Sequence, residues 1–502
     1  MRKDPSQGVG SGAGTTIALS LGAMLAVAIL GSRLALWAAE QTQYFRDVRN
    51  PTSDFGYAFT LPLHVVQAAY PGWNVVIIVW VMLALLALLG SLLSRALGSN
   101  VRSAAWITIG GFMLVGGALT LCPIIQSADL YYYLAYGHIY GLHGINPYLL
   151  PAAVSSADDA ALAATLRFLG NPPFSSPYGP LWTLISGGLA VIERGTGLWF
   201  QAYSYRLLAL GCGIASVGAL LYAARKNHDG GMEGAAHVAF HPLVLYETAV
   251  GAHNDIAMVA PAAWAFAIVD RMPLFAALLL GAAVGIKYVA IVALPFLALR
   301  AARQSALTAV LVVIICVAIP ILCLRPFYIG AAGGHAVGLE TGYLSMSLTW
   351  LLNLPVFATG LGRGPALPGL PVLPLIGELS WARVVQLAVV ASFLAIGVTA
   401  FVREIRIPSF ANLTRTVTAL LWSLPLMHPW YGQWLILGAA QRGRWGMYAW
   451  WFGTLILGLY AVDGVSAAVL PLWVLVLLTV AYLAIPVFIA LRVPRDASPA
   501  QS

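Results

Sequence analysis

The stretch ALTAVLVVIICVAIPILCL, residues 306–324, contains no charged side chain. A helix of about 20 apolar residues, rising 1.5 Å per residue, crosses the hydrocarbon core of a bilayer, which is about 30 Å thick. Comparable apolar runs recur along the whole chain of 502 residues. The sequence therefore predicts an all-α, polytopic helical membrane protein with about 12–14 transmembrane helices.

The composition supports this class. Apolar residues make up 60 % of the chain and charged residues 9 %, whereas an average soluble domain has about 25 % charged residues. This balance excludes an ordinary cytosolic enzyme, a disordered chain and a nucleic-acid binder. The four cysteines lie in or at the ends of apolar runs and show neither CxxC nor zinc-site spacing, so no disulfide framework or metal site is indicated.

Arginines at the ends of the apolar runs predict a topology, because cytoplasmic loops of membrane proteins are enriched in Arg and Lys. The expected order is a cytoplasmic tail (1–14), three spans (15–122), an external loop (123–177), core spans (178–324), an external Gly/Pro-rich loop (325–382), C-terminal spans (383–491) and a cytoplasmic tail (492–502). Single spans are expected near 15–38, 73–94, 104–122, 179–193, 204–224, 306–324, 383–402 and 413–427.

Residues 236–299 are ambiguous. They fit two or three full spans, or half-length helices broken at Gly251 and Gly285. Helices meeting near Lys287 would be about 20 and 18 Å long, too short to cross, and broken helices occur at membrane depth only inside protein or beside a cavity. A continuous helix over 274–299 is the alternative, and it would leave Lys287 unpaired. We expect the broken form, with Asp255 and Lys287 facing outside.

The external loop is expected to pack back onto the membrane surface through two amphipathic helices. The first follows from SADLYYYLAYGHIYGLHGINPYLLP, 127–151, where helical spacing puts one acidic and four tyrosine side chains on one stripe: Asp129, Tyr132, Tyr133, Tyr136 and Tyr140. The alternative is an interfacial helix with a tyrosine belt, in which Asp129 is only an N-cap. The second helix is expected over 155–169, with Asp158 and Asp159 as first-turn charges.

Two later segments combine polar residues with apolar surroundings. In NPPFSSPYGPLW, 171–182, the alternative to a functional role is a rigid turn that places Tyr178 and Trp182 in the headgroup layer. In HPLVLYETAVGAHNDIAMVAP, 241–261, the polar residues are Glu247, His253, Asn254 and Asp255. Ionisable groups at membrane depth are costly and usually mark a function, although residues 253–255 could simply cap the next span.

Two further features lie nearer the C-terminus. Lys287 is the one lysine inside an apolar run; it either contacts a lipid phosphate or extends its amine to the interface. MHPWYGQWL, 427–435, puts His428, Trp430 and Tyr431 at an external helix junction, where an aromatic belt explains most of the pattern.

Taken in order, an Asp-x-x-x-Tyr helix ending in Gly-x-Asn-Pro-Tyr, then Ser-Pro-Tyr-Gly-Pro-Leu-Trp, then Gly-x-His-Asn-Asp resembles the GT-C class of polytopic membrane glycosyltransferases. The sequence is most similar to bacterial polyprenol-phosphomannose-dependent α-1,6-mannosyltransferases. The resemblance is best over 120–300, and only MHPWY extends it. It implies that Asp129 is the catalytic base. The external loop follows the third span here, whereas it follows the first span in most members.

The resemblance implies an enzyme that moves a hexose, with mannose favoured, from a polyprenyl-phosphate sugar to a glycan or lipid-linked acceptor. Phosphate leaves as an anion, so the leaving group needs no general acid. One carboxylate that takes the proton from the acceptor hydroxyl therefore suffices, whereas glycoside hydrolysis uses a pair of carboxylates. A cationic cradle would stabilise the departing phosphate, with Lys287 and His253 as candidates. Substrate-binding roles are expected for Tyr133, Tyr178, Asn254, Asp255, His428 and Tyr431. Direct attack would invert the anomeric carbon.

The expected setting is the plasma (inner) membrane, with both termini cytoplasmic and the active site outside. Expected partners are the donor, a glycan or glycolipid acceptor and membrane lipids, with no nucleic acid. No cofactor is assigned, and a divalent metal ion stays open. Alternatives are a non-catalytic transporter or flippase for polysaccharide or lipid carrier, and a glycan ligase of the same class. Charges gather at external loops and no repeat is evident, which counts against a transporter.

Overall fold

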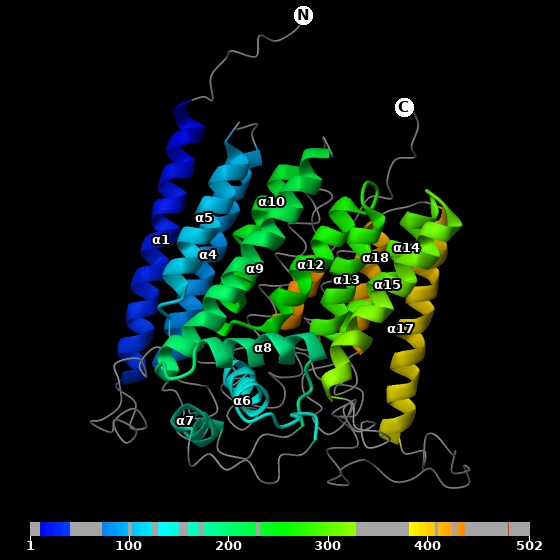
Figure 1. Cartoon of the computed structure of the whole chain (residues 1–502). Helices are drawn as coiled ribbons and strands as arrows, with labels where there is room; N and C mark the ends of the chain where they lie inside the picture. The colour runs from blue at the N-terminus through cyan, green and yellow to red at the C-terminus, as the bar shows by residue number, and fades with distance from the viewer. Residues whose placement is uncertain are drawn as a thin grey trace, which may run out of the picture.

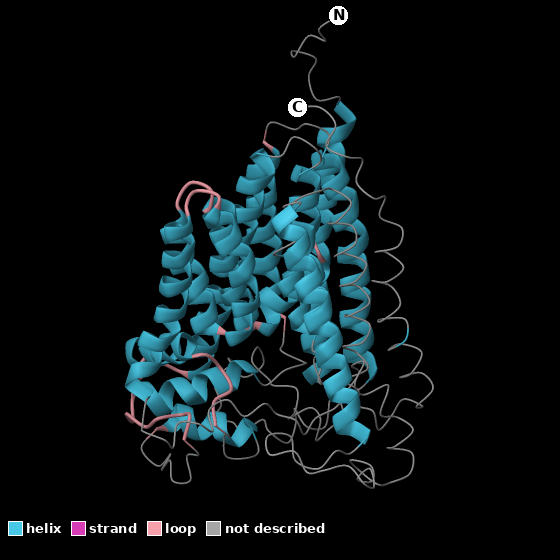
Figure 2. Ribbon diagram, turned by 90° about the vertical axis from the view of Figure 1, so that its right-hand side faces the viewer, coloured by secondary structure: helices cyan, strands magenta, loops and turns pink. Residues whose placement is uncertain are grey.

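The computed structural model describes residues 11–40, 73–98, 103–122, 129–149, 159–169, 175–226, 231–327, 381–406, 410–423, 429–436 and 480. Within these residues every regular element is a helix and there is no strand (Figure 2). Five helices are long and apolar enough to cross a membrane: Ala13–Ala38, Ile77–Gly98, Phe200–Arg225, Ala306–Phe327 and Leu387–Arg406. The all-α membrane fold is therefore confirmed.

Several expected segments lie outside the described residues. They include 1–10 of the first tail, residues 123–128, 150–158 (with Asp158) and 170–174 of the external loop, most of the Gly/Pro-rich loop, nearly all of the last two spans, the tail 492–502 and the candidate His428.

The long helices stand roughly upright beside one another in Figure 1. They are α1 (Ser11–Glu40), α4 (Trp73–Gly98), α9 (Leu198–Lys226), α15 (Ala306–Leu324) and α17 (Trp381–Arg406), and the shorter α5 (Ala104–Leu119) stands beside α4. Shorter elements complete the bundle: α10 (Gly231–Ala239), α11 (Pro242–Tyr246), η2 (Glu247–Gly251), α12 (Asn254–Ile268), α13 (Pro273–Ile286), η3 (Tyr288–Ala293), α14 (Leu294–Ala302), η4 (Arg325–Phe327), α18 (Phe410–Ser423) and η6 (Pro429–Leu435).

Three helices lie across one end of this bundle, which we name the loop end: α6 (Asp129–Gly141), α7 (Ala160–Leu169) and α8 (Pro180–Ile192) (Figure 1). The prediction of a span over 179–193 is therefore wrong. The 13 residues of α8 make a helix about 20 Å long, and it runs crosswise to the upright helices. Glycines allow this packing, because a Cβ at Gly141 would lie only 2.3 Å from the carbonyl oxygen of Gly187.

The opposite end of the bundle, which we name the arginine end, carries linked polar groups from three helices and from the turns that follow α12 and α14. Arg271 donates to the Tyr222 hydroxyl at 3.2 Å. Gln304 donates to the Asp270 carbonyl at 3.0 Å, and Arg300 Nε lies 3.6 Å from Glu404 Oε1. Cationic helix ends gathered in this way are typical of the cytoplasmic side of membrane proteins.

The helix is broken at Lys287, as the lengths predict. α13 ends at Ile286, Lys287 has an extended backbone (φ −148°, ψ 116°), and a short 3₁₀ helix, η3, begins at the next residue. The loop before α8 fills the break, because Gly179 N–H donates to the Ile286 carbonyl at 3.0 Å. The carbonyl that the break would leave unpaired is thereby satisfied.

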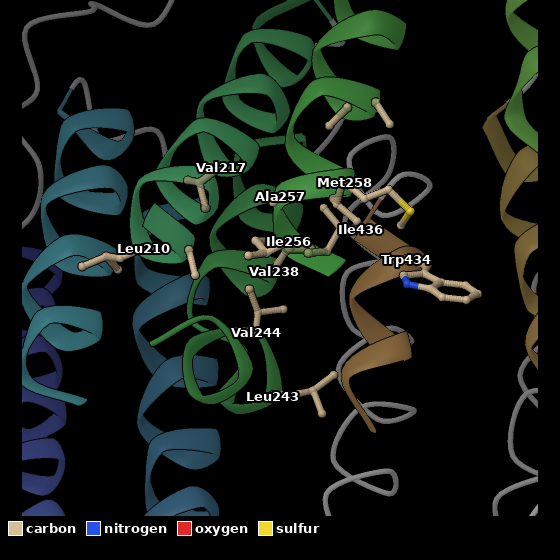
Figure 3. Close-up of a cluster of buried hydrophobic side chains, with 14 of the residues drawn as sticks. Leu210, Val217, Val238, Leu243, Val244, Ile256, Ala257, Met258, Trp434 and Ile436 are labelled. Atoms are coloured by element: carbon tan, nitrogen blue, oxygen red, sulfur yellow. The ribbon is translucent and has the colours of Figure 1, made fainter. Parts of the chain in front are cut away.

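A hydrophobic cluster fixes the segment between α10 and α12. Figure 3 shows side chains of the cluster on α9, α10, α11, α12 and residues 434–436, among them Leu210, Val238, Val244, Ile256 and Ile436. Each of these five side chains is buried. Residues 253–255 lie directly before Ile256, so this packing determines where their polar side chains are held.

The Gly179 contact gives a first testable expectation. A Cβ at Gly179 would lie 2.2 Å from the Gly285 carbonyl oxygen, and backbone cannot move aside as a flexible side chain can. Gly179→Ala should therefore destabilise the protein by about 1–3 kcal/mol, the usual cost of overpacking, and lower its melting temperature in detergent. Gly188→Ala is the matched control, since nothing lies within 4 Å of its Cβ position. Equal melting temperatures would contradict the contact.

Candidate active site

Asp129 is the first residue of α6, at the loop end. The helix N-terminus carries a partial positive charge that favours an ionised carboxylate. The side chain is 23 % exposed, and its Oδ2 lies 3.2 Å from Nδ1 of His253. α6 itself is buried on several faces, including Leu130 and Tyr131 beside the tyrosine stripe. Such burial is unlike a helix that floats in the interface, so the interfacial alternative is disfavoured.

His253 lies directly against Asp129 and has no exposed surface. Its ring stacks on Trp430, with centroids 3.9 Å apart and planes 11° from parallel. Its other nitrogen, Nε2, lies 3.3 Å from Glu247 Oε2. The residue precedes α12 without a side-chain capping bond. The alternative in which residues 253–255 serve only as a cap is therefore disfavoured.

Lys287 forms a close pair with a fully buried carboxylate. Its Nζ lies 2.7 and 2.9 Å from the two oxygens of Asp255. Trp434 Nε1 donates to the same carboxylate at 2.5 Å. The ammonium also faces the rings of Tyr431, 4.6 Å away, and Trp434, 5.5 Å away. Lys287 is thus paired at the break between α13 and η3, and 20 % of its side chain is exposed.

Buried tyrosine side chains pack next to these charged groups. The Tyr133 hydroxyl accepts the backbone N–H of Asn254 at 3.1 Å, and its ring packs edge-on against Tyr178 and Trp182. Burial, reinforced by the nearby Asp129 carboxylate, raises the pKa of Tyr133 well above its ordinary value, so the phenol stays neutral. Tyr178 and Trp182 are both buried, which disfavours a place in the headgroup layer.

The structure brings together all the expected site residues that it describes: Asp129, Tyr133, Tyr178, His253, Asn254, Asp255, Lys287 and Tyr431. Sequence reasoning interpreted Trp430 only as part of an aromatic belt and assigned no role to Trp434. The sequence feature that could have identified them is the run of aromatic residues at 430, 431 and 434 within one short helix.

A second polar cluster ties α7 to α6. Asp159 caps α7 by accepting the backbone N–H of Leu162 at 2.8 Å, and its Oδ2 also lies 2.8 Å from His138 Nδ1 and 3.0 Å from His143 Nε2. Burial alone would raise the pKa of Asp159, but these hydrogen bonds together lower it. Among the described residues, no group of three or more His, Cys, Asp or Glu is arranged to hold a metal ion.

Asp159→Asn tests this cluster through stability. Asn can still cap the helix, but it loses the charged hydrogen bonds, worth about 1.5–3 kcal/mol. The folded-state pKa of Asp159 lies below its ordinary value of 3.8, so the wild-type advantage is complete above that pH and disappears as the pH falls through the folded value. Melting curves at pH 7 and pH 3 measure this; a difference independent of pH would contradict it.

Comparison with known proteins gives one match. The family model for the MptA_B family, described as alpha-(1->6)-mannopyranosyltransferase, N-terminal domain, matches residues 12–303. That match covers more than half of the chain and includes every site residue from Asp129 to Lys287. No curated protein and no solved structure matches the chain.

Proposed function

The chain belongs to the alpha-(1->6)-mannopyranosyltransferase family, and on that premise we propose that it transfers mannose from a polyprenyl-phosphate donor to a glycan or lipid-linked acceptor. The reaction takes place at the loop end, which faces outside the plasma membrane, and it inverts the anomeric carbon. The arginine end then faces the cytoplasm, as the positive-inside rule expects. The family assignment favours mannosyl transfer over the non-catalytic transporter and the glycan ligase considered above.

One observation carries this proposal. Within the buried cluster, a carboxylate and an ammonium group are each partly exposed, Asp129 at 23 % and Lys287 at 20 %. They are joined through residues 253–255, because His253 contacts Asp129 and Asp255 contacts Lys287. A base and a cation at one surface are the two groups that transfer from a phosphate donor requires.

In the proposed reaction, Asp129 takes up the proton that is released and Lys287 stabilises the phosphate that leaves. The acceptor hydroxyl oxygen bonds to the anomeric carbon while the bond from that carbon to the phosphate oxygen breaks. The hydroxyl proton passes to Asp129, and the bonding electron pair leaves with the phosphate. An ammonium has three donors, and two of them lie on the Asp255 oxygens. The third donor of Lys287 is the one that we assign to the donor phosphate.

The buried residues have supporting roles in this proposal. His253 has no exposed surface, so we assign it to holding Asp129 rather than to binding phosphate directly. Tyr133 and Asn254 connect α6 to α12 through their hydrogen bond, and Tyr178 packs beside Tyr133. Tyr431 lies against Lys287 and is the aromatic side chain that we place beside the substrate. A substrate-binding role for His428 stays a prediction.

The donor class is tested with the purified protein in liposomes. Radiolabelled mannose is supplied either as polyprenyl-phosphate mannose or as GDP-mannose, together with a mannoside acceptor. We expect transfer only from the lipid-linked donor, with an α-linked product when the donor is β-linked. Transfer from GDP-mannose alone would contradict the proposal.

A further inference from the structure

The short helix η6 contacts the candidate site although it lies outside the residues that the family model matches, which end at 303. Two of its tryptophans reach different ionisable side chains. Trp430 stacks on the His253 ring, with centroids 3.9 Å apart. Trp434 donates its indole N–H to Asp255 Oδ1 at 2.5 Å. The first contact belongs to the side of the site that holds the proposed base, and the second to the side that holds the phosphate-binding cation.

The Asp255 carboxylate is held by hydrogen bonds from two separate elements. It has no exposed surface. Lys287 Nζ donates to both of its oxygens, at 2.7 and 2.9 Å, and Trp434 donates to Oδ1. An ammonium can follow a carboxylate that rotates, because its three donors turn about a flexible stem, whereas an indole has a single donor in the plane of its ring. The Trp434 hydrogen bond therefore fixes the orientation of the carboxylate, and Lys287 aligns with it.

Trp434 is well suited to this role because its indole is packed on several sides. Only 4 % of the side chain is exposed, and Trp434 and Ile436 both belong to the hydrophobic cluster in Figure 3. The indole stacks on the Tyr431 ring, with centroids 4.7 Å apart. Its face also lies 5.5 Å from Lys287 Nζ, within the range of a cation–π attraction. At this degree of burial, Trp434 acts through its neighbours and not by touching the substrate.

We propose that Trp434 is a positioning residue for donor binding, which holds Lys287 Nζ through Asp255 so that the third N–H of the ammonium is left for the donor phosphate. This inference rests on the proposed function. Lys287 needs such support, because it leaves the chain at an extended residue between two helices and its four-carbon stem is flexible. Without the indole N–H, Asp255 Oδ1 loses a donor, and the ammonium turns toward that oxygen and away from the phosphate.

The test is the variant Trp434→Phe, which keeps a ring and removes the N–H. Purified protein is titrated with a phosphonate analogue of polyprenyl-phosphate mannose, so that binding is measured without turnover. We expect the dissociation constant to rise about tenfold, the loss of one hydrogen bond to a charged group, and kcat/KM for the donor to fall equally. The acidic limb of the pH–rate profile should not move, because the His253 ring that contacts the base stacks on Trp430.

Trp264→Phe is the matched control. The Trp264 ring packs against Tyr222, with centroids 5.7 Å apart, and the Tyr222 hydroxyl accepts from Arg271 at the arginine end. Trp264→Phe makes the same chemical change in a half-buried tryptophan away from the proposed site. Its affinity for the analogue should equal that of the wild type.

A second background separates positioning from a purely structural role. In the variant Lys287→Met with Asp255→Asn, the groups through which Trp434 acts are gone, so adding Trp434→Phe should weaken binding of the analogue no further. An equal loss in both backgrounds would overturn the proposal, and so would wild-type affinity in Trp434→Phe alone. If Trp434→Phe does not fold, the same comparison with Trp434→His decides. Failure of the proposed function would instead appear as a wild-type protein that neither binds the analogue nor transfers mannose.

Discussion

Asp129→Asn is expected to lower mannosyl transfer by on the order of 100-fold or more, the usual loss when a positioned general base is removed. Asn has almost the same shape, and its oxygen can still accept the hydrogen bond from His253 Nδ1, which lies 3.2 Å from the carboxylate in the wild type. The amide cannot take a proton from the acceptor hydroxyl. The loss should therefore appear in kcat, measured with polyprenyl-phosphate mannose, at unchanged melting temperature.

Asp270→Asn is the matched control for this experiment. Asp270 is exposed at the arginine end, where its backbone carbonyl rather than its carboxylate accepts from Gln304. Its variant should transfer mannose at the wild-type rate. Near-normal transfer by Asp129→Asn, with folded protein at normal levels, would remove Asp129 from the role of base.

Lys287→Met is expected to have the second largest effect. The substitution removes the proposed phosphate contact, so kcat/KM for the donor should fall by on the order of 100-fold, more than for the acceptor. It also leaves the Asp255 carboxylate, which has no exposed surface, without its ion-pair partner. Breaking a buried pair from one side costs about 3–5 kcal/mol, so the melting temperature should fall as well.

A double variant separates these two effects. Lys287→Met with Asp255→Asn removes the unpaired charge and should recover most of the lost stability, whereas the defect in donor use should remain. Full recovery of donor use in the double variant would show that Lys287 acts only as the partner of Asp255. Equal losses for donor and acceptor in the single variant would likewise contradict the phosphate assignment.

Much of the fold follows from the sequence because local physics determines it. Long charge-free runs such as 306–324 form helices that are long and apolar enough to cross a membrane. The break at Lys287 follows from helix lengths, because the two helices on either side of this charged residue are each too short to cross a bilayer. The ordered polar segments also identify the cluster, which joins Asp129 on α6 to Lys287 after α13.

Non-local contacts explain what the sequence does not reveal. The run over 179–193 is as apolar as a span, and only the close approach of Gly137 and Gly141 to α8 shows that it packs crosswise on α6. Because 179–193 does not cross the bundle, the chain makes one crossing fewer before α12, and residues 253–255 therefore lie at the loop end. The distinct roles of His253 and Lys287 depend on exposure, and neither periodicity nor spacing reports which ionisable side chain is covered by its neighbours.

The most direct test of the proposed site is a cryo-EM structure of the protein with a phosphonate analogue of polyprenyl-phosphate mannose, which binds but cannot transfer. We expect the phosphonate within hydrogen-bond distance of Lys287 Nζ at the loop end, with the anomeric carbon of the mannose on the side of the Asp129 carboxylate. A phosphonate bound instead at the arginine end, beside Arg300 and Arg303, would contradict both the site and the orientation proposed for the protein.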